Sequence, residues 1–203
     1  MPASAVSIIN VGYRSTNYWV ISAGRSRVLV DLGWPGTMGT MRANLSRADI
    51  PLREIQYGLA THYHIDHAGL AQDLKNAGVP LLILDVQVPF IGLLKRHIKA
   101  EDHFTEISMH GNAIISAAES RALLHGVGIA GEILHTPGHS DDSVSLLLDD
   151  GRAFTGDLTD PMMVGPENPD IVRASWQLLK DRGATQIYTG HGPIRPLPAL
   201  DAL

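Results

Sequence analysis

The segment from Ile55 to His67 constrains this chain more than any other, because an apolar stretch runs directly into a dense group of histidines. Residues 55–60 are typical of a short buried strand, and residues 62–67 then read His-Tyr-His-Ile-Asp-His. His62 and His64 lie two positions apart, so their side chains point to the same side at the end of a strand. Asp66 and His67 begin the next turn, and the four side chains can therefore face one pocket.

The residue types in this motif favour metal binding. Neutral imidazole and carboxylate groups bind zinc, and also iron, cobalt, nickel or manganese. The alternative is a polar surface loop before a helix, but clustered uncharged imidazoles gain nothing evident from solvent exposure. The chain has no cysteine, which excludes disulfides, thiolate ligands and cysteine nucleophiles. Any metal must use nitrogen and oxygen ligands.

Three later segments share one pattern, in which a short apolar strand ends in a turn that presents a histidine or an aspartate. They cover residues 134–140, 153–157 and 187–192, and they present His139, Asp157 and His191. A neighbouring glycine lets the backbone pass close to an ion, and strand ends are rigid supports for ligands. Each segment alone is equally consistent with an ordinary turn, so its weight comes from the motif at residues 62–67.

The pattern along the chain predicts two sheets covered by helices. Strands are expected at residues 6–11, 17–21, 27–31, 55–60, 81–84, 131–135, 143–148, 152–155 and 186–189. Helices are expected at residues 37–48, 68–76 and 169–181. Antiparallel strands open each half, and helices separate later strands. The length of 203 residues, with 44% hydrophobic and 18% charged residues, fits one domain, residues 1–203.

Charge and hydropathy limit the partners and the location. The net charge is −5 and no basic run is present, which argues against a nucleic-acid partner because phosphate binding needs clustered Lys and Arg. The N-terminal residues lack the features of a signal peptide, and no stretch is long enough to span a bilayer. We expect a cytoplasmic protein that acts on a small-molecule substrate and binds no membrane, while its oligomeric state is left open.

Together the four segments resemble the metallo-beta-lactamase superfamily in order and spacing, from about Asn17 to Pro193. The resemblance implies an α+β fold, a four-layer αβ/βα sandwich of two mixed β-sheets with helices on the outer faces. It also implies two divalent metal ions, with zinc expected and iron or manganese as alternatives. The implied ligands are His62, His64 and His139 for one ion, Asp66, His67 and His191 for the other, and Asp157 as a bridge. Asp66 is also the implied catalytic carboxylate.

Asp31 matches an early aspartate of that family, which usually supports the metal site from behind the ligands. Its alternative interpretation is a turn residue at the end of a strand. Asp141 and Asp142 follow His139, but two adjacent acids after Gly-His-Ser are expected to form a solvated turn.

The implied reaction is hydrolysis of an ester-like bond, a thioester or lactone foremost, by metal-bound hydroxide. Asp157 together with an intact His67 resembles the hydrolase branch, whereas class B beta-lactamases lack this bridging aspartate. Two alternatives stay open. One is a persulfide dioxygenase with a single iron, and the other is a metal-binding module without catalysis.

Substrate selection is expected in residues 86–126, the longest stretch between the metal motifs. Residues 88–94 are apolar, and basic residues follow at Lys95, Arg96, His97 and Lys99. The segment either packs a helix face on the core or folds over the metals. In the second case Phe90 lines the substrate pocket, and Arg96 meets a substrate carboxylate or phosphate.

Overall fold

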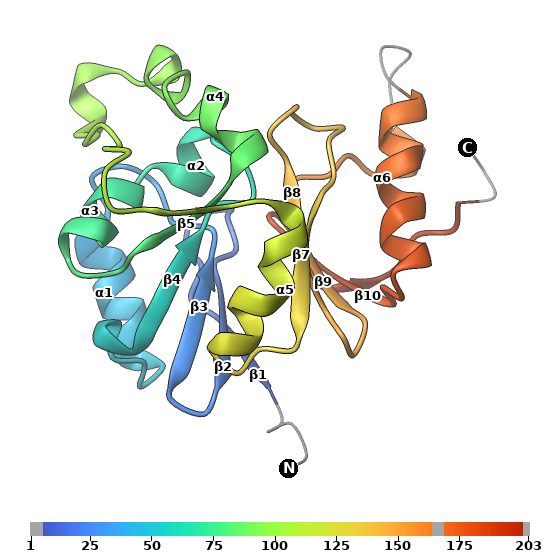
Figure 1. The fold of residues 1–203 in the computed structure, drawn as a ribbon. Coiled ribbons are helices and arrows are strands. Elements are labelled where there is room, and N and C mark those ends of the chain that lie inside the picture. Colours follow the sequence, from blue (N-terminus) through green and yellow to red (C-terminus); the bar gives the residue numbers. More distant parts are fainter. Residues whose placement is uncertain (1–5, 164–168, 201–203) are drawn as a thin grey trace.

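Two mixed β-sheets lie face to face between helices in the computed structural model, which describes residues 6–163 and 169–200 (Figure 1). The first sheet has the order β1 (Ser7–Asn10), β2 (Trp19–Ala23), β3 (Ser26–Val30), β4 (Ile55–Leu59), β5 (Leu81–Leu84) and β6 (Ala113–Ile115). The second has the order β11 (Arg195–Pro196), β10 (Gln186–Thr189), β9 (Arg152–Gly156), β8 (Val144–Leu148) and β7 (Gly131–His135). In each sheet antiparallel and parallel pairs are mixed.

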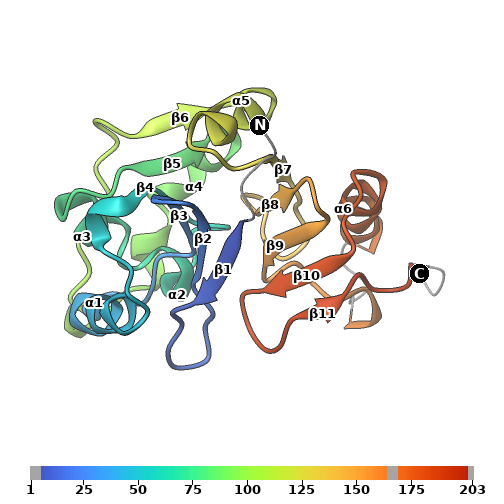
Figure 2. The same ribbon diagram turned by 90° about the horizontal axis from the view of Figure 1, so that it is seen from below.

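Helices connect and cover these strands. The α-helices are α1 (Met38–Arg47), α2 (Ile65–Ala68), α3 (Ala71–Asn76), α4 (Val88–Ile91), α5 (Ala117–Gly126) and α6 (Pro169–Asp181). Short 3-10 helices are η1 (Leu52–Glu54), η2 (Asp85–Gln87), η3 (Leu94–His97), η4 (Ala100–Asp102) and η5 (Pro161–Met163). Figure 2 shows the sheets side by side, with α1 and α3 outside the first and α6 outside the second.

The first sheet is buried on both faces. Val20 pairs with Leu29, and Ile21 pairs with Val28, so each pair shares one face of the sheet. Val20 and Leu29 pack in the cluster that contains Met41 of α1, whereas Ile21 and Val28 pack in the cluster shared with the second sheet. This alternation explains why the strands are apolar at nearly every position.

The second sheet has the same two-sided burial. Leu146 and Phe154 face the first sheet, and Leu147 belongs to the cluster beneath α6. On α6, the buried residues are spaced at helical intervals and lie on one face, namely Val172, Trp176 and Leu179. Helix, sheet, sheet and helix thus form four layers, which confirms the expected sandwich.

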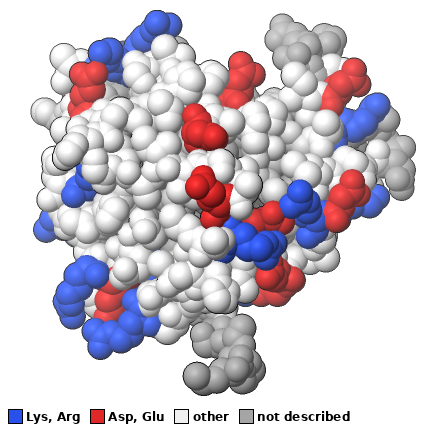
Figure 3. Space-filling model, viewed as in Figure 1, with Lys and Arg blue, Asp and Glu red and all other residues white. Residues whose placement is uncertain are grey.

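The structure refines several predicted boundaries. The helix expected at residues 68–76 is two helices, because the N–H of Leu70 donates to the carbonyl of Gly33 at 3.2 Å instead of continuing α2. The sequence did not predict β6, β11, α5, η2 or η4, whereas α4 lies where one of the two interpretations of residues 88–94 expected a helix. In the described residues no helix is both long and apolar enough to cross a membrane. Lys and Arg are interspersed with Asp and Glu on the face shown in Figure 3.

Strand directions bring the ligand-bearing turns to one edge of the sandwich. β3 and β4 are parallel, so their carboxyl ends meet. β8 is antiparallel to both β7 and β9, and β9 is parallel to β10, so the carboxyl ends of β7, β9 and β10 also meet. The segments that follow these five strands, α2 among them, contain every residue expected to bind or support a metal.

Candidate metal centre

The predicted ligands form three overlapping groups whose donor atoms lie close together. Within each group, the candidate ligand atoms all lie within 4.8 Å of one another. The groups are His62, His64 and His139; His62, His67 and Asp157; and Asp66, His67 and His191. Every residue that the resemblance assigned to a metal belongs to one of these groups.

Asp157 lies between the two ends of this cluster. Its Oδ2 is 3.4 Å from Nε2 of His67 and 3.3 Å from Nε2 of His191. The same oxygen is 3.8 Å from Nε2 of His139, which in turn lies 3.0 Å from Nδ1 of His64. One carboxylate oxygen is therefore near ligands of both predicted ions.

Thr61 and Asp31 orient the buried imidazole of His62. Both the N–H and the hydroxyl of Thr61 donate to Oδ1 of Asp31 at 2.8 Å. The Thr61 hydroxyl has used its proton, so at 3.1 Å it accepts from Nδ1 of His62. This tautomer leaves a lone pair on Nε2 of His62, the state that a metal ligand needs.

Other contacts orient the second end of the cluster. Nδ1 of His67 lies 2.9 Å from Oδ2 of Asp31, and both side chains are almost fully buried. Nδ1 of His191 donates to the carbonyl of Ser15 at 2.6 Å, because a carbonyl can only accept. The hydroxyl of Thr16 donates to Oδ2 of Asp66 at 3.0 Å. The loop between β1 and β2 thus supports two ligands.

The pKa values of the ligands shift in directions set by burial and by their neighbours. Burial, reinforced by nearby His67, holds the pKa of His62 well below its ordinary value, so this imidazole is neutral at neutral pH. Burial alone would raise the pKa of Asp66 and Asp157, but the close contacts of both carboxylates with the His67 imidazole lower both pKa values. Burial opposes the charged form of His67, yet three carboxylates, Asp31 first, raise its pKa. A divalent cation can replace the proton held there.

Two buried atoms fit a metal better than any protein partner. Nε2 of His62 and Oδ1 of Asp157 have no hydrogen-bond partner among the described residues. Leaving buried polar atoms unsatisfied costs about 1–3 kcal/mol each, so natural structures rarely keep them without a reason. Imidazole nitrogen and carboxylate oxygen are both zinc ligands. The residues present therefore fit the metal site that the sequence predicts.

Two cavities open beside the cluster. One of about 480 Å³ is lined by His139, Asp157 and His191, together with Met163 and Arg195. The other, of about 350 Å³, is lined by residues from the ligand loops and α4 and from the segment after it, including Tyr63, His64, His139, Phe90, Leu93 and Leu94. Each cavity can bring part of a substrate to the ligand cluster.

The structure places the two predicted substrate residues differently. Phe90 is half-buried and lines the cavity that also contains His64. Arg96 is exposed and is not among the residues that line either cavity. Arg195, for which the sequence predicted no role, lines the cavity of about 480 Å³ beside the cluster. It forms an ion pair with Asp160 and lies over the ring of Trp176.

The expected solvated turn after His139 is wrong for one of its two acids. Asp141 is exposed, but Asp142 is only 3% exposed because its carboxylate binds the backbone of the first ligand loop. The sequence also predicted no role for Thr16 or Thr61 in supporting the candidate ligands. Thr61 carried one signal, its position directly before His62, whereas Thr16 lies 50 residues from its partner Asp66.

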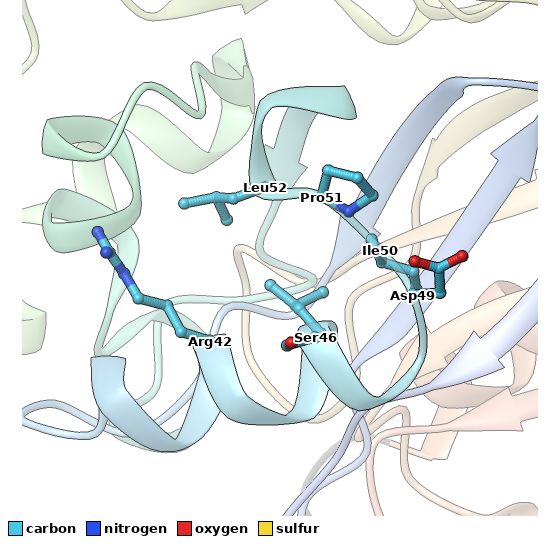
Figure 4. Close-up of a pocket in the computed structure, with 7 residues that line it drawn as sticks. Arg42, Ser46, Asp49, Ile50, Pro51 and Leu52 are labelled. Atoms are coloured by element: carbon cyan, nitrogen blue, oxygen red, sulfur yellow. The ribbon is translucent and has the colours of Figure 1, made fainter.

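A further surface pocket lies between the end of α1 and η1 and has no candidate ligand. Figure 4 shows its lining, which includes Arg42, Ser46, Asp49 and Leu52. It holds no histidine and a single acidic residue. The chemistry expected of this chain belongs to the ligand cluster instead.

Comparisons with known proteins agree with this site. The family model of the metallo-beta-lactamase superfamily matches residues 11–191. The chain is 30% identical over 201 residues to the probable metallo-hydrolase MJ0888 of Methanocaldococcus jannaschii, with 90% of each protein covered. It is 31% identical to the Beta-lactamase-like protein 2 homolog of Caenorhabditis elegans, covering 89% of this chain and 57% of that protein.

A fungal relative and a solved structure extend the comparison. The atrochrysone carboxyl ACP thioesterase of Claviceps purpurea is 27% identical, with 90% of this chain and 52% of that protein covered. The chain thus spans little more than half the length of the nematode and fungal relatives. The crystal structure of TTHA1623 in a di-iron-bound form has a TM-score of 0.72 at 22% identity, with 94% of each chain covered. The family model over residues 11–191 and the 30% identity to MJ0888 show that the chain belongs to the metallo-beta-lactamase superfamily.

Proposed function

We propose that this chain, a hydrolase of the metallo-beta-lactamase superfamily, uses two divalent metal ions to cleave an ester-like bond, foremost a thioester. The position of Asp157 carries the proposal. Its Oδ2 lies within 3.8 Å of His139 on one side and within 3.4 Å of His67 on the other. A carboxylate in this place can bridge two ions. A site for one ion with three ligands would not need a carboxylate here.

Residues next to the candidate ligands hold the ligand side chains in fixed orientations. Two divalent cations held by the cluster would supply Lewis-acid activation of water and of the substrate carbonyl. Asp31 and Thr61 hold His62 in the tautomer with a free Nε2. Thr16 donates to the carboxylate of Asp66, which is half-buried and is the candidate catalytic group. Preorganised ligands of this kind need little rearrangement during reaction.

The preference for a thioester rests on the cavities and on the names of relatives. The fungal relatives from Claviceps purpurea and Aspergillus terreus are named carboxyl ACP thioesterases. The cavity beside His64 offers Phe90, Leu93 and Leu94 to an apolar acyl group. Phe90 is the proposed apolar wall, and Arg96 remains a proposed contact for an anionic group outside the cavity. A lactone is the second candidate because its ring ester requires the same attack.

The proposal is tested by metal content and activity on the same preparation. Protein purified without added metal is analysed for its elements and then assayed with zinc, manganese or iron on acyl thioesters, lactones and phosphodiesters. We expect two ions per chain, zinc foremost, and highest kcat/KM on a thioester. One iron per chain, together with oxygen uptake on glutathione persulfide, would contradict the hydrolase proposal and support a dioxygenase. Full metal occupancy without turnover of any substrate would favour a metal-binding module.

The remaining parts of the proposal concern the cell and the partners. We also propose zinc as the resident ion, a cytoplasmic location and no nucleic-acid partner. The nitrogen and oxygen ligand types support zinc, and the charge of −5 argues against nucleic-acid binding. Cell fractionation and a binding assay with single- and double-stranded nucleic acid test the last two points.

A further inference from the structure

His62, His64 and His139, here called the three-histidine group, come from two loops that follow strands of different sheets. His62 and His64 follow β4 of the first sheet, whereas His139 follows β7 of the second. The donor atoms of these residues come within 4.8 Å of one another. Metal–ligand distances vary by only about 0.2 Å, so specific contacts must fix the position of one loop relative to the other.

Asp142 makes the contact that joins these loops. Its Oδ2 accepts a hydrogen bond of 2.7 Å from the backbone N–H of Tyr63. Tyr63 stands between His62 and His64, and Asp142 follows His139 by three positions. The bond therefore connects the middle of one ligand loop to the end of the other.

The side chain of Gln87 also connects the two ligand loops. Its side chain is fully buried, and Nε2 donates to the carbonyl of Ala60 at 3.0 Å and to that of Asp142 at 3.2 Å. Its Oε1 accepts from the N–H of Leu84 at 3.1 Å, which fixes the amide orientation. Gln87 thus binds the start of the first ligand loop and the end of the second at once.

The energetics indicate that Asp142 is more than a turn residue. A carboxylate that is 3% exposed must recover its lost hydration, and a hydrogen bond from a backbone N–H to an ionised oxygen is among the stronger ones available. A solvated turn would need no such burial. The carboxylate accepts from the backbone N–H of Tyr63, a donor that every residue except proline would provide.

We propose that Asp142, held by Gln87, is a positioning residue that sets the His62, His64 and His139 group before metal binds. The inference rests on the proposed metal site and not on the identity of the substrate. Loss of the Asp142 carboxylate frees the Tyr63 backbone and lets the two ligand loops separate. The Asp66, His67 and His191 group has its own contacts, through Asp31, Thr16 and Ser15, and keeps its geometry.

The test measures metal affinity directly. Demetallated protein is titrated with zinc against a chromogenic chelator, and His139→Ala and His191→Ala identify which binding step belongs to which group. We expect Asp142→Ala to weaken the step lost in His139→Ala by about 10–100-fold and to spare the other step. Asp142→Asn keeps a side-chain oxygen that can accept from Tyr63 and should restore the affinity to within a few-fold.

Asp102→Ala is the matched control. Its Oδ2 accepts from the backbone N–H of Lys99 at 2.8 Å, the same kind of bond in η4, and no ligand loop is involved. This variant should leave both steps unchanged. If Asp142→Ala does not fold, Asp142→Ser removes the carboxylate while keeping a short polar side chain, and the same weakening is expected.

Two results would overturn the inference. One is wild-type affinity at both steps in the folded Asp142 variant. The other is an equal loss at both steps together with a lower melting temperature of the metal-free protein, which a merely structural role predicts. Failure of the proposed function is separate, because a chain that binds a single ion or cleaves no thioester still reports whether Asp142 supports the three-histidine group.

Discussion

Gly190 offers a sharp test of the ligand geometry because no side chain fits at its position. A Cβ there would lie 2.4 Å from Oδ1 of Asp157 and 2.7 Å from Cε1 of His67. Ordinary carbon contacts are near 3.5 Å, so the Asp157 oxygen would have to move by about 1 Å. That is several times the ~0.2 Å by which metal–ligand distances vary. Gly190→Ala should therefore weaken metal binding by at least about 10-fold and lower kcat/KM with it.

The backbone of Gly190 makes this effect purely steric. Its φ does not lie in the left-handed region, so alanine is conformationally allowed there. Gly39, inside α1, is the matched control, since a Cβ there meets nothing within 4 Å. Gly39→Ala should leave metal affinity unchanged and, because Gly39 lies in the first turn of α1, raise the free energy of unfolding by at most about 0.5–1 kcal/mol.

The assay combines zinc titration of the demetallated variants against a chromogenic chelator with elemental analysis and circular dichroism. A metal-free Gly190→Ala protein with a native spectrum shows that the fold survives. If that protein then binds two ions with wild-type affinity, Asp157 and His67 do not hold metal in the arrangement described here.

Three further predictions follow from the same cluster. Asp157→Ala should weaken both ions, whereas His191→Ala should mainly weaken one, and two tightly bound ions in Asp157→Ala by elemental analysis would contradict the bridging role. Chelation should lower the melting temperature, because an ion bound only by the folded state adds RT ln(1+[L]/Kd) to the free energy of unfolding, and an unchanged melting curve after verified metal removal would count against the site. Phe90→Ala should change kcat/KM unequally among acyl substrates with metal content intact, and Arg96→Ala, measured alongside, tests whether an exposed arginine reaches a substrate beyond the cavity. A uniform loss on every substrate would make the segment structural.

The candidate ligand residues are predictable from the sequence because their signal is local. His62, His64, Asp66 and His67 lie within six positions, and each later ligand directly follows an apolar strand. Two sheets covered by helices are predictable for a similar reason, since two-sided burial makes strands such as residues 144–148 largely apolar, whereas the four-layer arrangement was implied by the family resemblance. These patterns need no knowledge of distant contacts.

What escapes prediction depends on partners far along the chain. Asp142 resembles a solvated residue until Tyr63, 79 positions earlier, provides a backbone donor. Thr16 has no ligand-like neighbours, and its role exists only because the β1–β2 loop reaches Asp66. Helix α5 is different, because Ser116 and Glu119 form a capping box, a local signal that the sequence itself carries.

The candidate ligands come from both sheets, so metal binding at the proposed site would depend on the spacing between the two sheets. His62 and His64 extend from the first sheet and His139 from the second, and the other group repeats this division with His67 and His191. Each ion would therefore bridge the two sheets at the edge where their strands end. Apolar packing between the sheets holds the layers together but does not fix their spacing to within about 0.2 Å, because side chains can repack at small cost. Directional contacts such as those of Asp31 and Asp142 are needed at this edge, and both are buried carboxylates that bind the same ligand loop, one at Thr61 and one at Tyr63.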